Sequence, residues 1–285
     1  MARLLIVGLG YSGEAIARLA IAEGFEVMAT TRRARQMPAG VVAVPFAQAA
    51  DAIATATHLI ATAPPGQDGD PALALFGGAV AAAAHLQWIG YLSTTGVYGD
   101  RGGDWVDEDT PPAPGLERSR RRLAAENAWR EAAGGRPLDI MRLAGIYGPG
   151  RSALDEVRSG HARRVILPGH QFGRIHVDDI AGGTMAALRR PPQGARILNF
   201  SDDVPAESAA VLEEAARLLG VPPPPAIPFA EAVTSMSDMG RSFWSENRKV
   251  ASRKTQAALV RPWNYPGFRE GLAAILCQER GEGLA

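Results

Sequence analysis

Short apolar runs alternate with helix-forming segments through the first 200 residues of the chain. A continuous apolar run such as 4–7 is typical of a strand that is buried on both faces of a parallel sheet. The segment 14–23 places Ile16 and Leu19 on one stripe, which predicts an amphipathic helix. Such alternation predicts an α/β fold, a doubly wound parallel sheet with right-handed crossovers. The predicted strands are 4–7, 26–31, 41–44, 58–63, 88–93, 138–143 and 197–200, and the predicted helices include 14–23, 71–84, 117–133, 207–219 and 267–277.

The pattern changes after Gly148, where proline and glycine become frequent and strands become sparse. A helix that ends near Arg190 interrupts this part, and Asp178 or Asp179 suits its N-cap. We therefore predict a sheet domain over 1–150, to which 175–204 returns. A smaller C-terminal lobe is predicted over 151–174 and 205–285.

The first strand runs into glycines spaced G-x-G-x-x-G, within the sequence Gly8-Leu9-Gly10-Tyr11-Ser12-Gly13. Gly8 allows a tight turn, Gly10 lets the backbone approach a pyrophosphate, and Gly13 lets the helix pack close to the strand. The N–H groups at the helix start then hold the anion, which predicts a Rossmann-type dinucleotide site. The alternative is a glycine-rich turn that binds no ligand.

The end of the second strand indicates which dinucleotide binds. NAD-binding folds usually carry Asp or Glu at this point, to hold the ribose 2′-OH. This chain has Thr31, Arg32 and Arg33 and no acid, and guanidinium groups suit a 2′-phosphate. We predict NADP(H) as the preferred cofactor, with NAD(H) as the second possibility; a solvated basic turn is the alternative. Ala63 and Pro64 follow another strand, where the sheet edge would face the dinucleotide.

Composition narrows the choice of partners and compartment. Lys+Arg and Asp+Glu balance at 30 each, which argues against a nucleic-acid partner or an anionic membrane surface. Cys277 is the only cysteine, which excludes an internal disulfide and a cysteine-based metal site, and we expect no metal and a reducing, cytoplasmic compartment. The apolar stretch 73–92 carries His85 and Gln87, and we interpret it as a helix and a strand rather than a membrane span.

Four segments together resemble the extended short-chain dehydrogenases/reductases, the NAD(P)-dependent epimerase/dehydratase group. They occur in the family's order. They are the glycine loop, Ser93-Thr94-Thr95-Gly96-Val97-Tyr98-Gly99, Arg142-Leu-Ala-Gly-Ile-Tyr-Gly-Pro-Gly150, and Arg174-Ile-His-Val-Asp-Asp-Ile-Ala181. With a fifth, weaker match, Asn247-Arg248-Lys249-Val250 followed by Tyr265-Pro-Gly-Phe-Arg-Glu-Gly271, the resemblance covers nearly the whole chain. The resemblance implies a Rossmann-type sheet, a nicotinamide cofactor, and a lobe that covers a small-molecule substrate.

The chain departs from this family at the catalytic Tyr-x-x-x-Lys pair. The register of the helix that follows the Val-Tyr-Gly segment puts Arg118 at the tyrosine position and Arg122 at the lysine position. Arginine keeps its proton at any working pH, so Arg118 cannot be a general base. Arg122 could still bind a ribose or a phosphate of the cofactor. The resemblance is therefore to an atypical member of the family.

Other side chains must then supply the chemistry. The resemblance makes Ser93, Thr94 and Thr95 candidates to hydrogen-bond a substrate oxygen, and Tyr98 and Tyr147 candidate acids. The two tyrosines could instead pack within their turns. We also predict that three basic side chains bind the substrate: Arg118, Arg174 and His176. Arg118 could instead belong to a solvated helix face, and His176 could simply fix the start of its own helix.

Two functions of different classes remain open. The first is an oxidoreductase or epimerase-like enzyme, for which the family resemblance implies a sugar-nucleotide or small carbonyl substrate. The second is a non-catalytic NADP(H)-binding redox sensor that docks a regulatory partner, since the acid–base pair is missing while the nucleotide loop is intact. Family members are often dimers, which leaves a homodimer open.

Overall fold

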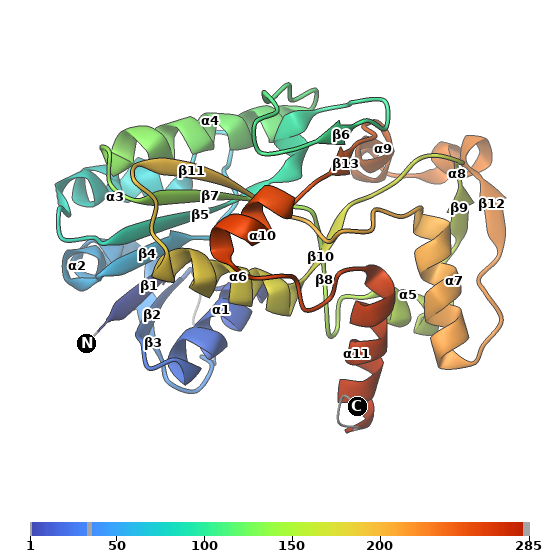
Figure 1. The fold of residues 1–285 in the computed structure, drawn as a ribbon, viewed down its shortest axis with the longest axis horizontal. Helices are drawn as coiled ribbons and strands as arrows, with labels where there is room; N and C mark the ends of the chain where they lie inside the picture. The colour runs from blue at the N-terminus through green and yellow to red at the C-terminus, as the bar shows by residue number, and fades with distance from the viewer. Residues whose placement is uncertain (1, 33–35, 282–285) are drawn as a thin grey trace.

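A parallel sheet of seven strands forms the centre of the molecule in the computed structural model, which describes residues 2–32 and 36–281 (Figure 1). Every strand pairs with its neighbour in parallel, for example Ile6 with Ile60 of the adjacent strand. The predicted Rossmann-type, doubly wound sheet is thus confirmed. In spatial order the strands are β11 (Ala195–Phe200), β7 (Leu138–Leu143), β5 (Trp88–Thr94), β4 (His58–Ala61), β1 (Arg3–Val7), β2 (Glu26–Thr31) and β3 (Val41–Pro45).

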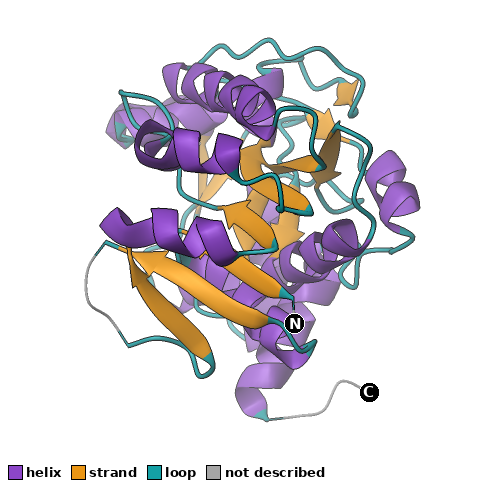
Figure 2. Cartoon of the chain, turned by 90° about the vertical axis from the view of Figure 1, so that its left-hand side faces the viewer, coloured by secondary structure: helices purple, strands orange, loops and turns teal. Residues whose placement is uncertain are grey.

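Helices cover both faces of this sheet, and the first strand shows why (Figure 2). All of its apolar side chains are buried, but they alternate between two cores. Leu4 and Ile6 belong to the core beneath one helix layer, whereas Leu5 and Val7 belong to the core beneath the other. The first layer consists of α1 (Tyr11–Ala22) and α6 (Val177–Arg189), with α10 (Arg253–Leu259) beside them, and the second of α2 (Ala49–Thr55), α3 (Pro71–Ala82) and α4 (Glu117–Ala133).

A smaller lobe lies beyond the carboxyl ends of the sheet strands, at the right in Figure 1. Its own apolar core joins Leu154, Val211 and Leu272 from three helices. The domain boundaries stay a prediction, and part of the segment 205–285 packs elsewhere: Leu259 and Trp263 lie in the core of the main sheet. The lobe helices are α5 (Ala153–Arg158), α7 (Ser208–Leu219), α8 (Phe229–Ser235), α9 (Asp238–Trp244) and α11 (Phe268–Arg280).

Three short parallel strand pairs lie outside the main sheet, one of them entirely within the lobe. They explain how a chain with few strands after Gly148 still forms a defined cleft, because each pair fixes two distant segments side by side. The pairs are β8 (Gly145–Tyr147) with β10 (Arg174–His176), β9 (Arg164–Ile166) with β12 (Ala226–Pro228), and β6 (Trp105–Val106) with β13 (Lys249–Val250). Two short 3₁₀ turns, η1 (Phe46–Gln48) and η2 (Thr95–Tyr98), complete the described elements.

Candidate functional site

The glycine loop between β1 and α1 is tightly constrained by its neighbours. Gly8 has φ of +99°, and a Cβ at this position would lie 3.2 Å from the Ala63 Cβ. The Gly8 N–H donates to Thr30 Oγ1 at 2.9 Å, and its carbonyl accepts from the Thr62 hydroxyl. A Cβ on Gly13 would lie 2.9 Å from the Gly8 carbonyl oxygen. The first and third glycines are therefore required by packing inside the protein.

The middle glycine has a different environment. A Cβ on Gly10 would meet no atom within 4 Å, so the space beside it is open. Gly10 is also the N-cap of α1, and no side chain caps that helix start in the described structure. The N–H groups of Tyr11 and Ser12, in the first turn, therefore have no intrahelical acceptor and lie beside open space. This combination fits the pyrophosphate of a dinucleotide.

The residues predicted to choose the dinucleotide lie at the end of β2. Thr31 is half-buried and Arg32 is exposed, directly after the strand. Arg33 lies outside the described residues. Ala63 and Pro64 follow β4, which pairs with β1; Ala63 is half-buried beside Gly8, while Pro64 is exposed.

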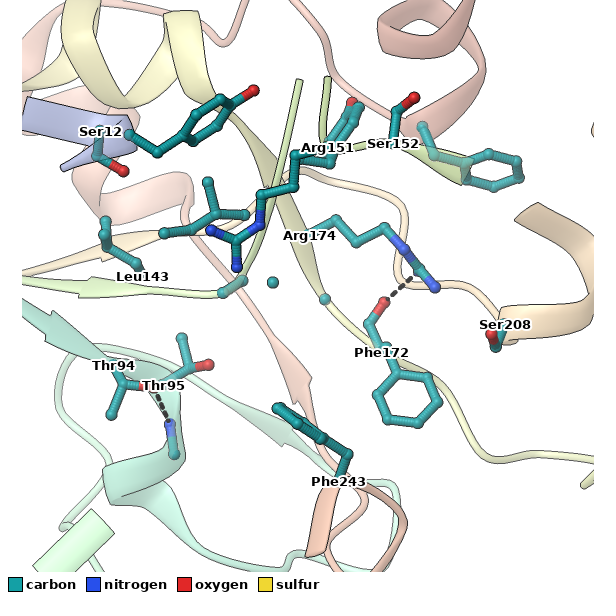
Figure 3. A pocket seen from close by; sticks show the side chains of 18 of the residues that line it. Ser12, Thr94, Thr95, Leu143, Arg151, Ser152, Phe172, Arg174, Ser208 and Phe243 are labelled. Atoms are coloured by element: carbon teal, nitrogen blue, oxygen red, sulfur yellow. Dashed lines mark hydrogen bonds between the residues drawn. The ribbon is translucent and has the colours of Figure 1, made fainter. Parts of the chain in front are cut away.

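A cleft of about 1120 Å³ opens where the sheet meets the lobe (Figure 3). The residues 10–13 of the glycine loop line it, and so do Thr94 and Thr95 at the end of β5. The lobe contributes residues from α5, α7, α9 and α11. The lining also carries five arginines, which exceed its three carboxylates Asp155, Glu156 and Glu246. The arginines are Arg118, Arg122, Arg151, Arg174 and Arg248.

The three predicted hydroxyl residues after β5 have different surroundings. Ser93 is buried, and its hydroxyl donates to Glu126 Oε1 at 2.6 Å. Thr94 Oγ1 accepts from the Gly96 N–H at 3.1 Å, which leaves the hydroxyl proton of Thr94 available to another acceptor. Figure 3 shows the side chains of Thr94 and Thr95 side by side at the cleft. The threonines can therefore reach a bound molecule, whereas the Ser93 hydroxyl is engaged in a structural bond.

Beneath these residues lies a buried ion pair. Arg142 donates to both carboxylate oxygens of Glu126, at 3.1 and 2.8 Å, and both side chains are almost completely inaccessible to solvent. The Arg142 guanidinium also lies 4.8 Å from the ring centre of Tyr98. The Tyr98 hydroxyl donates to Asn199 Oδ1 at 2.7 Å, and burial raises the pKa of Tyr98. The structure thus places Tyr98 in the interior and not among the cleft-lining residues.

Tyr147 does line the cleft, but its hydroxyl is directed into the lobe core. That hydroxyl donates to the Gly267 carbonyl at 3.4 Å, just before α11. A side chain at Gly271 would overlap the phenol, so α11 packs directly on it. Burial raises the pKa of Tyr147. This arrangement suits the packing role that we gave as the alternative for this residue.

His176 is buried at the start of α6 and is not among the residues that line the cleft. Its Nδ1 accepts from the Asp178 N–H at 3.2 Å, so it caps the helix as the alternative reading of the sequence had it. Burial lowers its pKa. The prediction of Asp178 or Asp179 as N-cap is wrong, because α6 begins at Val177; Asp179 instead accepts from the backbone N–H groups that follow α10.

Arg118 and Arg122 lie one turn apart on α4 and both line the cleft. The Arg118 guanidinium lies 4.4 Å from the ring centre of Phe243, on α9 of the lobe. Arg122 donates to the Leu92 carbonyl at 2.6 Å. Arg174 donates to two backbone carbonyls, at 2.9 and 3.1 Å, and burial lowers its pKa. The structure thus brings Arg118, Arg122 and Arg174 to one cleft, unlike His176, and each of these three arginines already has a partner.

Sequence reasoning missed several residues of the cleft. Arg151 directly follows the Tyr-Gly-Pro-Gly segment, and its position after this loop was the one available signal. No signal in the sequence pointed to Phe243 or Glu246, because α9 and the segment after it reach the cleft only through long-range packing.

No protein-family model matches the sequence. Protein YeeZ of Escherichia coli K12 is 30% identical over 244 residues, which cover 79% of this chain and 86% of YeeZ. A 3-diazoavenalumate denitrifying reductase of Streptomyces is 31% identical over 180 residues, and this match covers 59% of the chain and 58% of the reductase. The chain thus spans less than two thirds of the reductase's length.

Solved structures extend the comparison. A conserved protein of unknown function from Silicibacter pomeroyi is 40% identical, with a TM-score of 0.91 over 98% of this chain and 99% of that one. A protein of Methylobacillus flagellatus, described as an NAD-dependent epimerase/dehydratase, is 25% identical, with a TM-score of 0.74 over 98% and 99% of the two chains. Among the described helices, none combines the length and the apolar character needed to cross a membrane.

Proposed function

The chain belongs to the extended short-chain dehydrogenase/reductase family, the NAD(P)-dependent epimerase/dehydratase group, and we propose that it is an NADP(H)-dependent oxidoreductase within it. Its substrate would be a small carbonyl compound or a sugar nucleotide that carries negative charge. One observation carries the proposal: the same cleft is lined by residues 10–13 of the glycine loop and by Thr94 and Thr95.

The cofactor part of the proposal rests on the glycine loop and the end of β2. The open space at Gly10 and the uncapped start of α1 would accept the pyrophosphate. Thr31 and Arg32 would contact a 2′-phosphate, and no carboxylate at the end of β2 opposes it. When bound, the nicotinamide supplies or accepts a hydride.

The substrate part rests on the hydroxyls and the cations of the cleft. Thr94 and Thr95 would hydrogen-bond the substrate oxygen, with solvent in the open cleft exchanging the proton, because the arginines cannot act as bases. The excess of arginine over carboxylate favours an anionic substrate. The name of the Streptomyces relative, a reductase of 3-diazoavenalumate, supports reductive chemistry on an anion.

A second function is a sensor that binds NADP(H) without turnover. The contact between Arg118 and Phe243 favours it, since the position of the family's tyrosine is used to join α4 to α9. Cofactor binding could change this contact and so the surface of the lobe.

Turnover distinguishes the two. The protein would be incubated with NADPH and a panel of carbonyl compounds and sugar nucleotides, with absorbance at the nicotinamide band as the readout. An enzyme oxidises NADPH with a panel member, and Thr94→Val or Thr95→Val lowers the rate at least about tenfold by removing a hydrogen bond while keeping the shape. NADPH affinity should not change in either variant. A sensor shows NADPH-dependent protection from proteolysis and no oxidation.

A further inference from the structure

Tyr11 connects the glycine loop to a second loop across the cleft. It is the first residue of α1, and its hydroxyl donates to the Pro149 carbonyl at 3.0 Å, in the loop between β8 and α5. The fit between the two loops is close. A Cβ on Gly148 would lie 2.5 Å from the Tyr11 hydroxyl and 2.6 Å from Val177 Cγ1, so only glycine is accommodated there. The second loop is therefore seated on the first turn of α1.

The loop ends in Arg151, whose backbone is fixed while its side chain is free. The backbone of Arg151 exchanges two hydrogen bonds with that of Gly148, at 3.0 and 3.2 Å. Ser152 then starts α5 in a capping box with Asp155. The Arg151 guanidinium lies 5.8 Å from the Tyr11 ring centre and points into the cleft in Figure 3. Within the described residues, it makes no hydrogen bond or ion pair.

The other cleft arginines have partners that reduce their capacity for a ligand. Arg122 and Arg174 donate to backbone carbonyls, and Arg248 donates both to a carbonyl and to the Glu246 carboxylate. Arg118 lies on the face of Phe243 and donates to Met239 Sδ at 2.9 Å. Arg151 alone among the five, as far as the structure describes them, has a guanidinium fork without a hydrogen-bond acceptor, and such a fork binds phosphate with two parallel hydrogen bonds.

We propose that Arg151, positioned by Tyr11 and the Gly148 loop, is a phosphate-binding residue of the cleft. This proposal rests on the proposed function. The phosphate belongs either to the dinucleotide pyrophosphate at the adjacent start of α1 or to a phosphate-bearing substrate. In both cases the hydrogen bond from Tyr11 to Pro149 couples the position of the loop that carries Arg151 to that of the glycine loop.

Binding titrations of the full-length protein test this with two probes. NADPH, followed by its fluorescence, reports the dinucleotide source, and uridine diphosphate, followed by calorimetry, reports the substrate source. Arg151→Gln should raise the Kd of at least one probe about tenfold or more, because it removes charge-assisted hydrogen bonds to the phosphate. Arg163→Gln, which removes an exposed arginine outside the cleft, should leave both values unchanged.

Tyr11→Phe sharpens the test, because it keeps the ring and removes only the bond to Pro149. It should weaken binding of the same probe by about threefold, less than Arg151→Gln does. The proposal is overturned if Arg151→Gln binds NADPH and uridine diphosphate as the wild type does, or if the wild type binds neither. Loss of uridine diphosphate binding in Arg151→Gln, with no wild-type binding of NADPH or NADH, would reject the proposed cofactor and retain the role of Arg151.

Discussion

The two sides of the cleft have kept different parts of the family pattern. On the α1 side, Gly8 and Gly13 are required by atoms within about 3 Å, and Gly10 leaves open space. On the α4 side, the register that we predict puts Arg118 and Arg122 at the positions of the family's tyrosine and lysine, and these arginines contact α9 and a backbone carbonyl of β5. We therefore expect nucleotide binding and acid–base chemistry to be separable in this fold, because each would depend on a different wall of the cleft.

The segment 93–99, which packs against α4, matches the family's motif, but part of it has a structural role in this protein. Ser93 and Tyr98 both match the family segment, yet both now belong to a buried network around Glu126 and Arg142. Ser93, Thr94, Thr95 and Gly96 of that segment line the cleft, and of these Ser93 already donates to Glu126. Four substitutions test this contrast between the α1 side with the end of β2, here the binding wall, and the buried pair Glu126 and Arg142 of the α4 side, here the structural wall.

The largest effect should come from the buried pair of the structural wall. Glu126→Ala leaves the Arg142 guanidinium buried without its carboxylate, which should cost about 3–5 kcal/mol in the free energy of unfolding. Arg130, a third exposed and 3.7 Å from Glu126, offers a control, and Arg130→Gln should cost less than about 1 kcal/mol. Denaturant unfolding measures both. Equal losses would contradict a structural role specific to Arg142.

A substitution in the binding wall should weaken NADPH binding at least as strongly as it lowers stability. Gly8→Ala combines a positive φ with a close approach to Ala63, and should abolish NADPH binding, a loss of about 100-fold or more. Gly24→Ala has a similar φ of +86° in open space, so it should cost about 1–2 kcal/mol of stability and leave NADPH binding unchanged. If Gly8→Ala still binds NADPH as the wild type does, the glycine loop is not the site of dinucleotide binding.

Arg32 should affect the choice of dinucleotide and little else, because its side chain is exposed at the end of β2. Arg32→Gln should weaken NADPH binding about tenfold or more, with NADH affinity unchanged. Arg18→Gln, an exposed arginine on α1, serves as the matched charge control. A parallel loss for NADH and NADPH would place Arg32 elsewhere than at the 2′-phosphate.

The smallest effect concerns His176, which lies behind the cleft and not in it. Burial lowers its pKa from the ordinary value of 6.5, so the unfolded chain gains a proton at higher pH than the folded one. Its contribution is complete above pH 6.5 and is lost as the pH falls below that value, by about 1.4 kcal/mol for each unit of pKa difference. His176→Asn keeps an N-cap acceptor, and should reduce the fall of Tm between pH 7 and pH 5. If the Tm of His176→Asn falls as much as that of the wild type, other groups control the pH dependence of stability.

The sequence was sufficient to predict most helices and strands, but it was insufficient to predict which way the side chains point. Helix α4 was predicted over 117–133 and is observed at Glu117–Ala133, because capping and composition are local. Tyr98 and Thr94 belong to the same short segment. Thr94 precedes η2 and lines the cleft, whereas Tyr98 at the end of η2 is buried, because the chain turns between them. Arg151 and Phe243 reach the cleft through contacts between segments far apart in the chain, which no local pattern encodes.

We propose above all that the binding wall holds a dinucleotide with a 2′-phosphate. The purified protein would be titrated with NADPH and, in parallel, with NADH, with quenching of tryptophan fluorescence as the readout. We expect saturable NADPH binding at least about tenfold tighter than NADH binding. Equal affinities would contradict the role of Thr31 and Arg32, and absence of binding to both would contradict the proposed function itself.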